Sequence, residues 1–199
     1  MARYPVALQQ LIAFLKKLPG VGTKTAERFA FHLLSWQPSE LAAFSTLAAN
    51  LRESITQCSE CHCLMENNSC PFCTDSIRDR SQICIITSAK DVYAIEETHS
   101  YKGLYHVLGC LLSPIEGKTI EHLHLDQLKK RIEAYPIKEV IIALDSTLEG
   151  DTTSLYLKEY LLKWGLSVSR LAFGLPLGSS LDFVDGGTLA RAFTGRQSF

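Results

Sequence analysis

The chain has 199 residues, of which 46% are hydrophobic and 21% charged, with a formal net charge of −1. This length allows one domain or two small ones, and the composition excludes a disordered, collagenous or coiled-coil protein. No apolar run approaches the roughly 20 residues of a membrane span, and the N-terminus lacks the pattern of a signal peptide. The sequence therefore predicts a cytoplasmic globular protein, in which seven cysteines favour metal binding or free thiols over disulfides.

Charge is distributed unevenly along the chain. Residues 1–57 hold six Lys and Arg against three Asp and Glu, whereas residues 58–80 and 81–199 each carry a net charge of −2. The overall charge argues against a protein that coats nucleic acid by bulk charge. The basic excess near the N-terminus is nevertheless sufficient for phosphate binding beside a suitable backbone motif.

The first third of the chain is predicted to be helical. Pro19 and Gly20 end a first helix, a second begins near Thr23, and a third covers residues 41–55. Apolar residues recur at helical spacing in the first of these helices: Leu8, Leu11, Ile12, Leu15 and Leu18.

The turn between the first two helices carries a glycine motif. Gly20 and Gly22 permit backbone conformations that a side chain would forbid, and the following helix offers unpaired N–H groups to an anion. Lys24 and Arg28 lie four residues apart, on one face of this helix. The pattern is typical of a helix-hairpin-helix motif, which grips DNA phosphates without reading bases. We predict that these four residues bind DNA; the alternative is an ordinary turn between helices.

Residues 58–80 contain a compact set of cysteines. Two CxxC pairs are separated by eight residues: Cys58, Cys61, Cys70 and Cys73. Such pairs can place four thiolates around one Zn²⁺, and four sulfur ligands leave no open coordination position. We therefore predict a structural zinc knuckle with one ion per chain. The alternatives are disulfides or unrelated thiols, and His62 or Cys63 could replace one of the ligands.

From residue 81 onward, short apolar runs alternate with helical patterns. Continuous apolar runs are expected for strands that are buried on both faces, and their alternation with helices implies βαβ units and a parallel sheet. A glycine-rich C-terminal segment follows, with a helical pattern at residues 188–193. The strands are predicted at residues 83–86, 105–108, 140–144 and 167–172, and the helices at 91–97, 125–132 and 152–164.

An acidic segment, residues 145–151, is predicted to form the loop after the third of these strands. It contains Asp145, Glu149 and Asp151. Binding sites in open α/β sheets lie beyond the carboxyl ends of the strands, and three carboxylates can hold Mg²⁺ there. The residues leave three interpretations open: a metal site, a surface for a basic partner, or a solvated loop.

The order of these parts resembles the RecR family of bacterial recombination mediators over essentially the whole chain. The resemblance implies a helix-hairpin-helix DNA-binding region at 1–57, a four-cysteine zinc knuckle at 58–80, a Toprim-like α/β domain at 81–173 and a C-terminal oligomerisation segment at 174–199. Beside the four cysteines, the matching stretches are residues 18–26, 28–34, 78–81, 101–108, 112–114, 147–151 and 174–178.

The resemblance also implies a non-enzymatic clamp in recombinational DNA repair. Members of this family form ring-shaped oligomers, usually tetramers, that encircle DNA. They act with RecO, and in some settings RecF, to load RecA onto single-stranded DNA. For this chain the resemblance implies sequence-independent binding to gapped or junction DNA, a nucleoid-associated location in the cytoplasm, and contact with RecO through Glu149 and Asp151.

Several positions depart from the related patterns. Toprim enzymes carry a glutamate at the end of the first strand and an Asp-x-Asp pair after the third, where this chain has Thr87, Asp145 and Thr147. One carboxylate in three argues against catalytic Mg²⁺ chemistry, so we expect no catalytic residues. Ser179 and Ser180 stand where the family has a pair of glycines. The alternative functions are a zinc-stabilised protein-interaction adaptor without DNA contact and a Mg²⁺-dependent Toprim enzyme.

Overall fold

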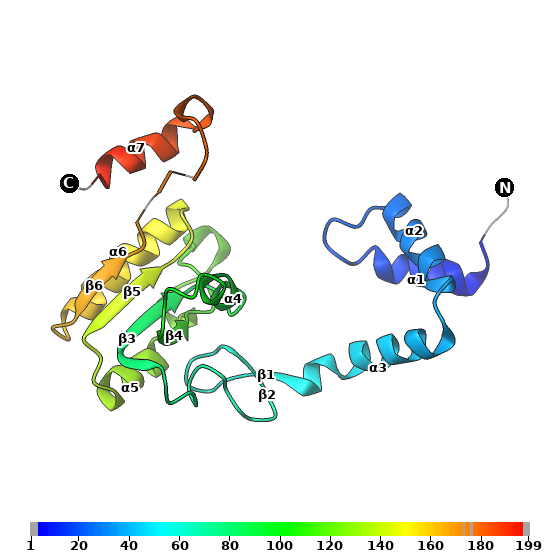
Figure 1. Cartoon of the computed structure of the whole chain (residues 1–199), viewed down its shortest axis with the longest axis horizontal. Coiled ribbons are helices and arrows are strands. Elements are labelled where there is room, and N and C mark those ends of the chain that lie inside the picture. The colour runs from blue at the N-terminus through cyan, green and yellow to red at the C-terminus, as the bar shows by residue number, and fades with distance from the viewer. Residues whose placement is uncertain (1–3, 173, 176, 197–199) are drawn as a thin grey trace. The chain divides into compact units, whose positions relative to one another are not determined.

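The computed structural model describes residues 4–172, 174–175 and 177–196. The chain divides into two compact units, Met1–Ser54 and Ile55–Phe199 (Figure 1). None of the described helices combines the length and the apolar character needed to cross a membrane.

The N-terminal unit consists of three helices, as the apolar spacing predicts. Helix α1 (Val6–Leu15) packs against α2 (Thr23–Leu34), and α3 (Pro38–Ser54) follows. The core between α1 and α2 is small because two alanines, one turn apart, allow the helices to approach closely. Its buried members are Leu8, Ile12, Ala26 and Ala30. Helix α3 buries none of its residues within the unit.

The second unit is built on a four-stranded parallel sheet, which confirms the predicted α/β architecture (Figure 1). The strands lie in the order β4-β3-β5-β6. Helices α4 (Asp91–Glu96), α5 (Leu125–Ala134) and α6 (Leu148–Leu162) connect successive strands. The strand bounds are Asp79–Ile86 for β3, Gly103–Val107 for β4, Glu139–Ala143 for β5 and Ser167–Arg170 for β6.

The two faces of the sheet bury different partners. Because side chains alternate along a strand, Ile83 and Ile85 of β3 join a core with α5 and α6. Cys84 and Ile86, on the opposite face, pack with α4 and with the cysteine-rich segment. Both faces are therefore covered, which explains the continuous apolar run in β3.

The cysteine-rich segment forms a hairpin that protects one edge of the sheet. Strand β1 (Ile55–Gln57) pairs antiparallel with β2 (Leu64–Glu66). The Val107 N–H, on the outer side of β4, donates a hydrogen bond of 2.9 Å to the Cys61 carbonyl. Strand edges left uncovered invite pairing with other chains, so this contact closes a vulnerable edge.

The C-terminal segment contains helix α7 (Gly186–Thr194), as its helical pattern predicts. The Asp185 carboxylate caps α7 by accepting a 3.0 Å hydrogen bond from the Thr188 N–H. Three short 3-10 helices complete the described elements: η1 (Pro114–Glu116), η2 (Ile120–His122) and η3 (Leu181–Phe183).

The acidic segment differs from its prediction as a loop. Helix α6 begins at Leu148, so Glu149 and Asp151 lie in its first turn. The Thr147 hydroxyl caps the helix by accepting a 3.1 Å hydrogen bond from the Gly150 N–H, and acidic residues in a first turn suit the helix dipole. A Cβ on Gly150 would lie 1.9 Å from the Asp145 carbonyl, so this tight turn requires glycine.

Candidate metal centre and nucleic-acid interface

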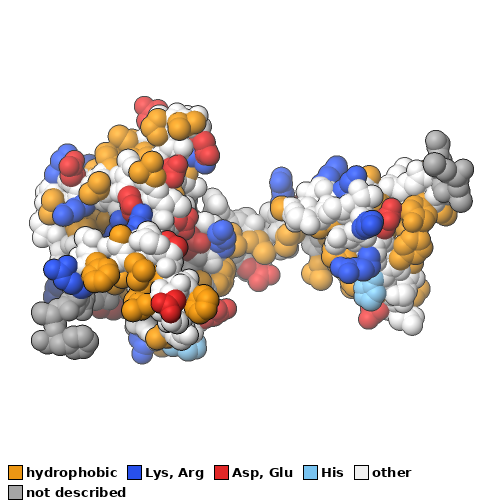
Figure 2. Space-filling model, turned by 90° about the horizontal axis from the view of Figure 1, so that it is seen from above, with side chains coloured by type: hydrophobic (Ala, Val, Ile, Leu, Met, Phe, Trp, Pro, Cys, Tyr) orange, Lys and Arg blue, Asp and Glu red, His pale blue; other side chains and the backbone are white. Residues whose placement is uncertain are grey.

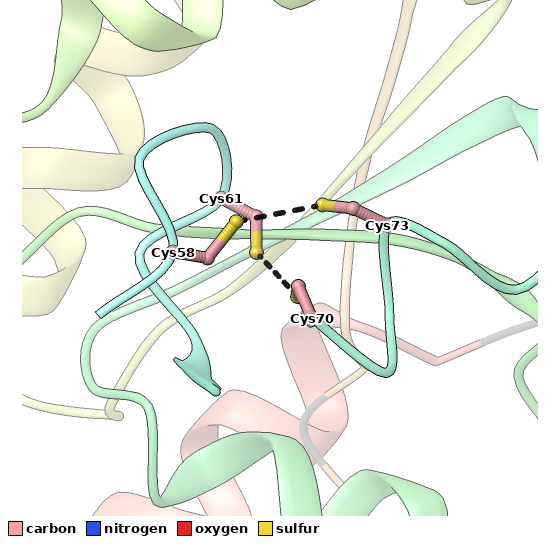
Figure 3. Close-up of side chains that lie close together, drawn as sticks. All are labelled: Cys58, Cys61, Cys70 and Cys73. Carbon is pink, nitrogen blue, oxygen red and sulfur yellow. Dashed lines mark hydrogen bonds between the residues drawn. The ribbon is translucent and has the colours of Figure 1, made fainter. Parts of the chain in front are cut away.

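The four cysteines of the two CxxC pairs converge as the spacing predicts (Figure 3). Their Sγ atoms all lie within 4.8 Å of one another. Cys61 and Cys70 are 3.5 Å apart between sulfurs, and Cys58 and Cys73 are 4.0 Å apart (Figure 3). Four thiolates bound tetrahedrally at about 2.3 Å from one zinc ion have sulfurs about 3.8 Å apart, so the set fits this metal.

The alternative ligands do not join this set. The Cys63 Sγ lies 4.0 Å from the Cys61 carbonyl, and it is not among the four converging sulfurs. His62 stacks instead on the His124 ring, with centroids 3.7 Å apart. None of the seven cysteines forms a disulfide. The geometry therefore selects the four cysteines of the CxxC pairs.

Local turns hold each pair in position. The His62 N–H donates a 2.9 Å hydrogen bond to the Cys58 carbonyl, and His62 itself adopts a left-handed conformation with φ of 60°. In the second pair, the Thr74 N–H donates the corresponding hydrogen bond, of 3.1 Å, to the Cys70 carbonyl. Each CxxC pair is thus a tight turn that directs two sulfurs to one side.

The thiols also polarise one another. Hydrogen bonds with Cys61 and Cys73 lower the pKa of Cys70 to about 2. The pKa of Cys61 is raised, first by its hydrogen bond with Cys63 and then by that with Cys70, and the pKa of Cys73 is raised by its hydrogen bonds with Cys61 and Cys70. The cluster consequently stabilises thiolate character at Cys70. A divalent cation would extend that character to all four sulfurs, because metal binding releases the remaining protons.

The glycine hairpin presents the start of α2. Gly20 has φ of +77°, which favours glycine, and Gly22 precedes the first residue of the helix. The side chains of Lys24 and Arg28 are exposed, whereas Ala26 is buried on the opposite side of α2. The N–H groups of a first helical turn have no acceptors within the helix, so backbone and cationic side chains can bind phosphates together here.

Two further lysines lie next to this hairpin in the chain, although the sequence motif does not include them. Lys16 and Lys17 lie just after α1, beside the hairpin, and both are exposed. Figure 2 shows several Lys and Arg side chains on the N-terminal unit. Their position three to four residues before Gly20 is the signal that could have identified them.

The residues at the Toprim positions lie together at the carboxyl ends of β3 and β5. Thr87, Asp145, Thr147 and Glu149 line one cleft of about 460 Å³. The Thr87 hydroxyl oxygen is buried without a hydrogen-bond partner. Among the described residues, the cysteines form the one converging set of metal ligands, so these carboxylates do not assemble such a site.

Asp151 is held by two arginines. Its Oδ1 pairs with Arg170 at 2.7 Å, and its Oδ2 pairs with Arg191 of helix α7 at 2.8 Å. Arg191 also donates a 2.6 Å hydrogen bond to the Ser146 hydroxyl. The arginines lower the pKa of Asp151, which keeps it ionised, whereas Glu149 on the same turn is exposed. Asp151 therefore joins the C-terminal helix to the start of α6.

Comparison with known proteins agrees with three parts of this architecture: the N-terminal helices, the α/β domain and the C-terminal segment. The family model "Toprim domain" matches residues 81–172, which hold the parallel sheet. The model "RecR, helix-hairpin-helix" matches residues 8–54, and "RecR, C-terminal" matches residues 174–197. Fold and sites together define a helix-hairpin-helix protein with a Toprim domain and a four-cysteine cluster, of the class that serves DNA recombination and repair.

Relatives match the chain over its full length. "Recombination protein RecR" of Protochlamydia amoebophila (strain UWE25) is 56% identical over 197 residues, covering 99% of this chain and 100% of the relative. The proteins of the same name from Chlamydia pneumoniae and Chlamydia muridarum (strain MoPn / Nigg) are 50% and 49% identical over 201 residues, with both chains covered completely. The chain belongs to the RecR family of recombination proteins, as its sequence motifs indicate, and this supports a role in recombinational DNA repair.

Proposed function

We propose that the chain is a non-enzymatic DNA clamp that acts with RecO, and in some settings RecF, to help load RecA onto single-stranded DNA. The glycine hairpin carries the proposal, because it places the open start of α2 beside the exposed Lys24 and Arg28. Contacts of this kind neutralise phosphates and read no bases, so binding is independent of sequence.

A ring of several copies, usually four in this family, explains how a chain with a net charge of −1 can hold DNA. Each copy contributes the basic residues 1–57, which carry a net charge of +3. Several such regions around one channel sum to a strong local positive potential. The proposed four-part division of the chain and its nucleoid-associated location in the cytoplasm follow from the same assignment.

The proposed absence of a chemical step is supported by the cleft at the Toprim positions. Thr87 has no ionisable group where a Toprim enzyme carries a glutamate, and Thr147 replaces an aspartate. Asp145 is then the single carboxylate at the three Toprim positions, and among the described residues it does not converge with other carboxylates into a metal-ligand set. We assign zinc a structural role, held by the four converging cysteines with no open coordination position.

Contact with RecO is proposed at the start of α6, with different parts for its two acids. Glu149 is exposed and can meet a basic partner directly. Asp151 is paired with Arg170 and Arg191, so it supports the same surface by holding α7 in place.

The first experiment measures binding of labelled gapped DNA by fluorescence anisotropy across a salt series, with and without RecO. Wild-type affinity should fall steeply with salt, because phosphate neutralisation releases counterions. Lys24→Glu with Arg28→Glu should weaken binding and reduce the slope of log K against log salt by about two. The matched control reverses two exposed lysines of α5, Lys129→Glu with Lys130→Glu, and changes the net charge equally.

The outcomes separate the candidate functions. Equal loss of affinity in both double variants would mean that net charge acts instead of the hairpin. Binding only in the presence of RecO would define a clamp that its partner loads. An absence of any contribution to DNA binding, with or without RecO, would favour the adaptor. A Mg²⁺-dependent nick in supercoiled plasmid that Asp145→Ala abolishes would establish an enzyme instead.

A further inference from the structure

A buried arginine from the Toprim domain lies against the cysteine cluster. Arg131, in helix α5, is only 3% exposed. One terminal nitrogen donates a hydrogen bond to the Tyr105 carbonyl, and the other lies 4.0 Å from the Cys73 Sγ. Its Nε is buried without a partner. The guanidinium therefore bridges the edge of the sheet and a metal ligand that is 58 residues away in the sequence.

No carboxylate in the described part of the chain neutralises this arginine. None of the ion pairs found among the described residues includes Arg131. Arg78, which packs close to the same segment, differs in this respect because it pairs with Glu96 at 2.7 Å. A guanidinium remains charged in any protein environment, and burial of an unpaired charge is costly. Arg131 thus requires an anion that no described acidic side chain provides.

The cysteine cluster supplies that anion when it holds zinc. Four thiolates around one Zn²⁺ leave two net negative charges in a mostly buried site. We propose that Arg131 is the counter-charge of the metal centre: it positions Cys73 and couples metal occupancy to the edge of the sheet. Groups around a metal's ligands orient them and tune the affinity for the metal, and Arg131 has the charge and the contact for this task.

The same edge of the sheet carries two further contacts with this region. The Val107 N–H bonds the Cys61 carbonyl at 2.9 Å, and the His124 Nδ1–H bonds the Val107 carbonyl at 2.9 Å. Arg131 of α5 also donates a hydrogen bond to the Tyr105 carbonyl. The backbone groups on the outer edge of β4 are therefore bonded to the cysteine-rich hairpin, to α5, and to His124, which directly precedes α5. Loss of the metal should therefore be felt in α5 as well as in the hairpin.

The test is the zinc affinity of the full chain, measured by competition with a chromophoric chelator. Arg131→Met keeps much of the length of the side chain and removes the charge, and it should weaken zinc binding roughly 10- to 100-fold. Arg131→Lys keeps the charge and should recover most of the affinity. The lysine variant also keeps the proposal falsifiable if the methionine variant does not fold.

Denaturant midpoints in zinc-buffered and in zinc-free solution provide the second readout. Arg131→Met should lower the midpoint more in zinc-buffered than in zinc-free solution, because the cysteine cluster carries its full negative charge only when zinc is bound. The matched control, Arg78→Met, removes a partly buried cation that has its own carboxylate, so it should lower both midpoints equally and leave zinc affinity unchanged.

Two results would overturn the proposal. One is wild-type zinc affinity in Arg131→Met. The other is an equal fall of both midpoints, which would leave Arg131 as a structural partner of the Tyr105 carbonyl only. The inference rests on the proposed zinc site, and different results would refute each of them. A wild-type chain that binds no stoichiometric zinc would refute the site itself, whereas the two results above would refute only the role of Arg131.

Discussion

In the N-terminal unit, the residues proposed to bind DNA lie on the surface, whereas in the second unit the proposed metal ligands lie inside. Lys24 and Arg28 project from α2 and contribute nothing to its small core. Cys61 and Cys70 are instead members of a core that they share with β3 and β4. The first unit thus separates binding from stability, and the second combines them.

This difference has a physical origin. Phosphate recognition uses exposed N–H groups and solvated cations, which need only a helix start and a turn to hold them. A four-sulfur site needs its ligands brought together and shielded, so the surrounding fold must supply the geometry. Substitutions on the first surface should change affinity alone, and substitutions at the second should change folding.

Removal of zinc should have the largest effect, confined to the second unit. Structural zinc contributes on the order of 10 kcal/mol in small zinc domains, so chelation or Cys73→Ser should unfold the hairpin around residues 58–73. Hydrogen exchange read by mass spectrometry should show lost protection there and unchanged protection in α1 and α2. Cys110→Ser, outside the cluster, is the control. Retained protection at 58–73 after complete zinc removal would refute a stabilising metal.

The second-largest effect should come from Asp151→Asn, which is expected to loosen the C-terminal helix α7. Asp151→Asn weakens two charge-assisted contacts, with Arg170 and Arg191, and should destabilise the docking of α7 by about 2 kcal/mol. Faster hydrogen exchange in α7 is the expected signal. Glu149→Gln should leave this exchange unchanged and weaken RecO binding. If both variants weaken RecO binding and neither changes hydrogen exchange in α7, Asp151 contacts the partner directly.

The glycine hairpin allows a sharper test within one motif. Gly20→Ala places a side chain at φ of +77° and should cost the N-terminal unit roughly 1–2 kcal/mol. Gly22 has φ of −79° and open space around a Cβ, so Gly22→Ala should be tolerated. Urea unfolding of the two variants makes the comparison. Equal midpoints would mean that the left-handed turn at Gly20 is not required.

The smallest effect concerns pH and His106 in the second unit. Burial lowers the pKa of His106 to about 3 from its usual value of 6.5. Between these values the unfolded chain binds a proton that the folded chain excludes, so stability should decrease as the pH falls, by about 1 kcal/mol at pH 5.5. Unfolding at pH values of about 7.5 and 5.5, with zinc in excess, should show a smaller loss for His106→Gln. An identical loss of stability in the wild type and in His106→Gln would mean that His106 does not cause the pH dependence.

Much of the architecture follows from short-range patterns. The two CxxC pairs, the glycine hairpin and the alternation of apolar runs with helices each lie within a few residues, and the structure confirms the cysteine set, the helices and the parallel sheet. The start of α6 was predicted wrongly as a loop. The helical pattern in the sequence was recognised only from residue 152, whereas the Thr147 cap and the close approach at Gly150 start the helix at Leu148 and place Glu149 and Asp151 in its first turn.

The sequence by itself therefore determined the four converging cysteines, the hairpin and the order of the elements, because local spacing controls turns, helix faces and strand burial. Only the tertiary structure decided which distant side chains meet. It brings Arg131 to Cys73, and it joins Asp151 to both Arg170 and Arg191. Arg131 lies three residues after Leu128, on the buried face of α5, yet no local pattern could show that its partner is a cysteine sulfur. Such pairings depend on how the sheet packs, and a one-dimensional pattern does not contain that information.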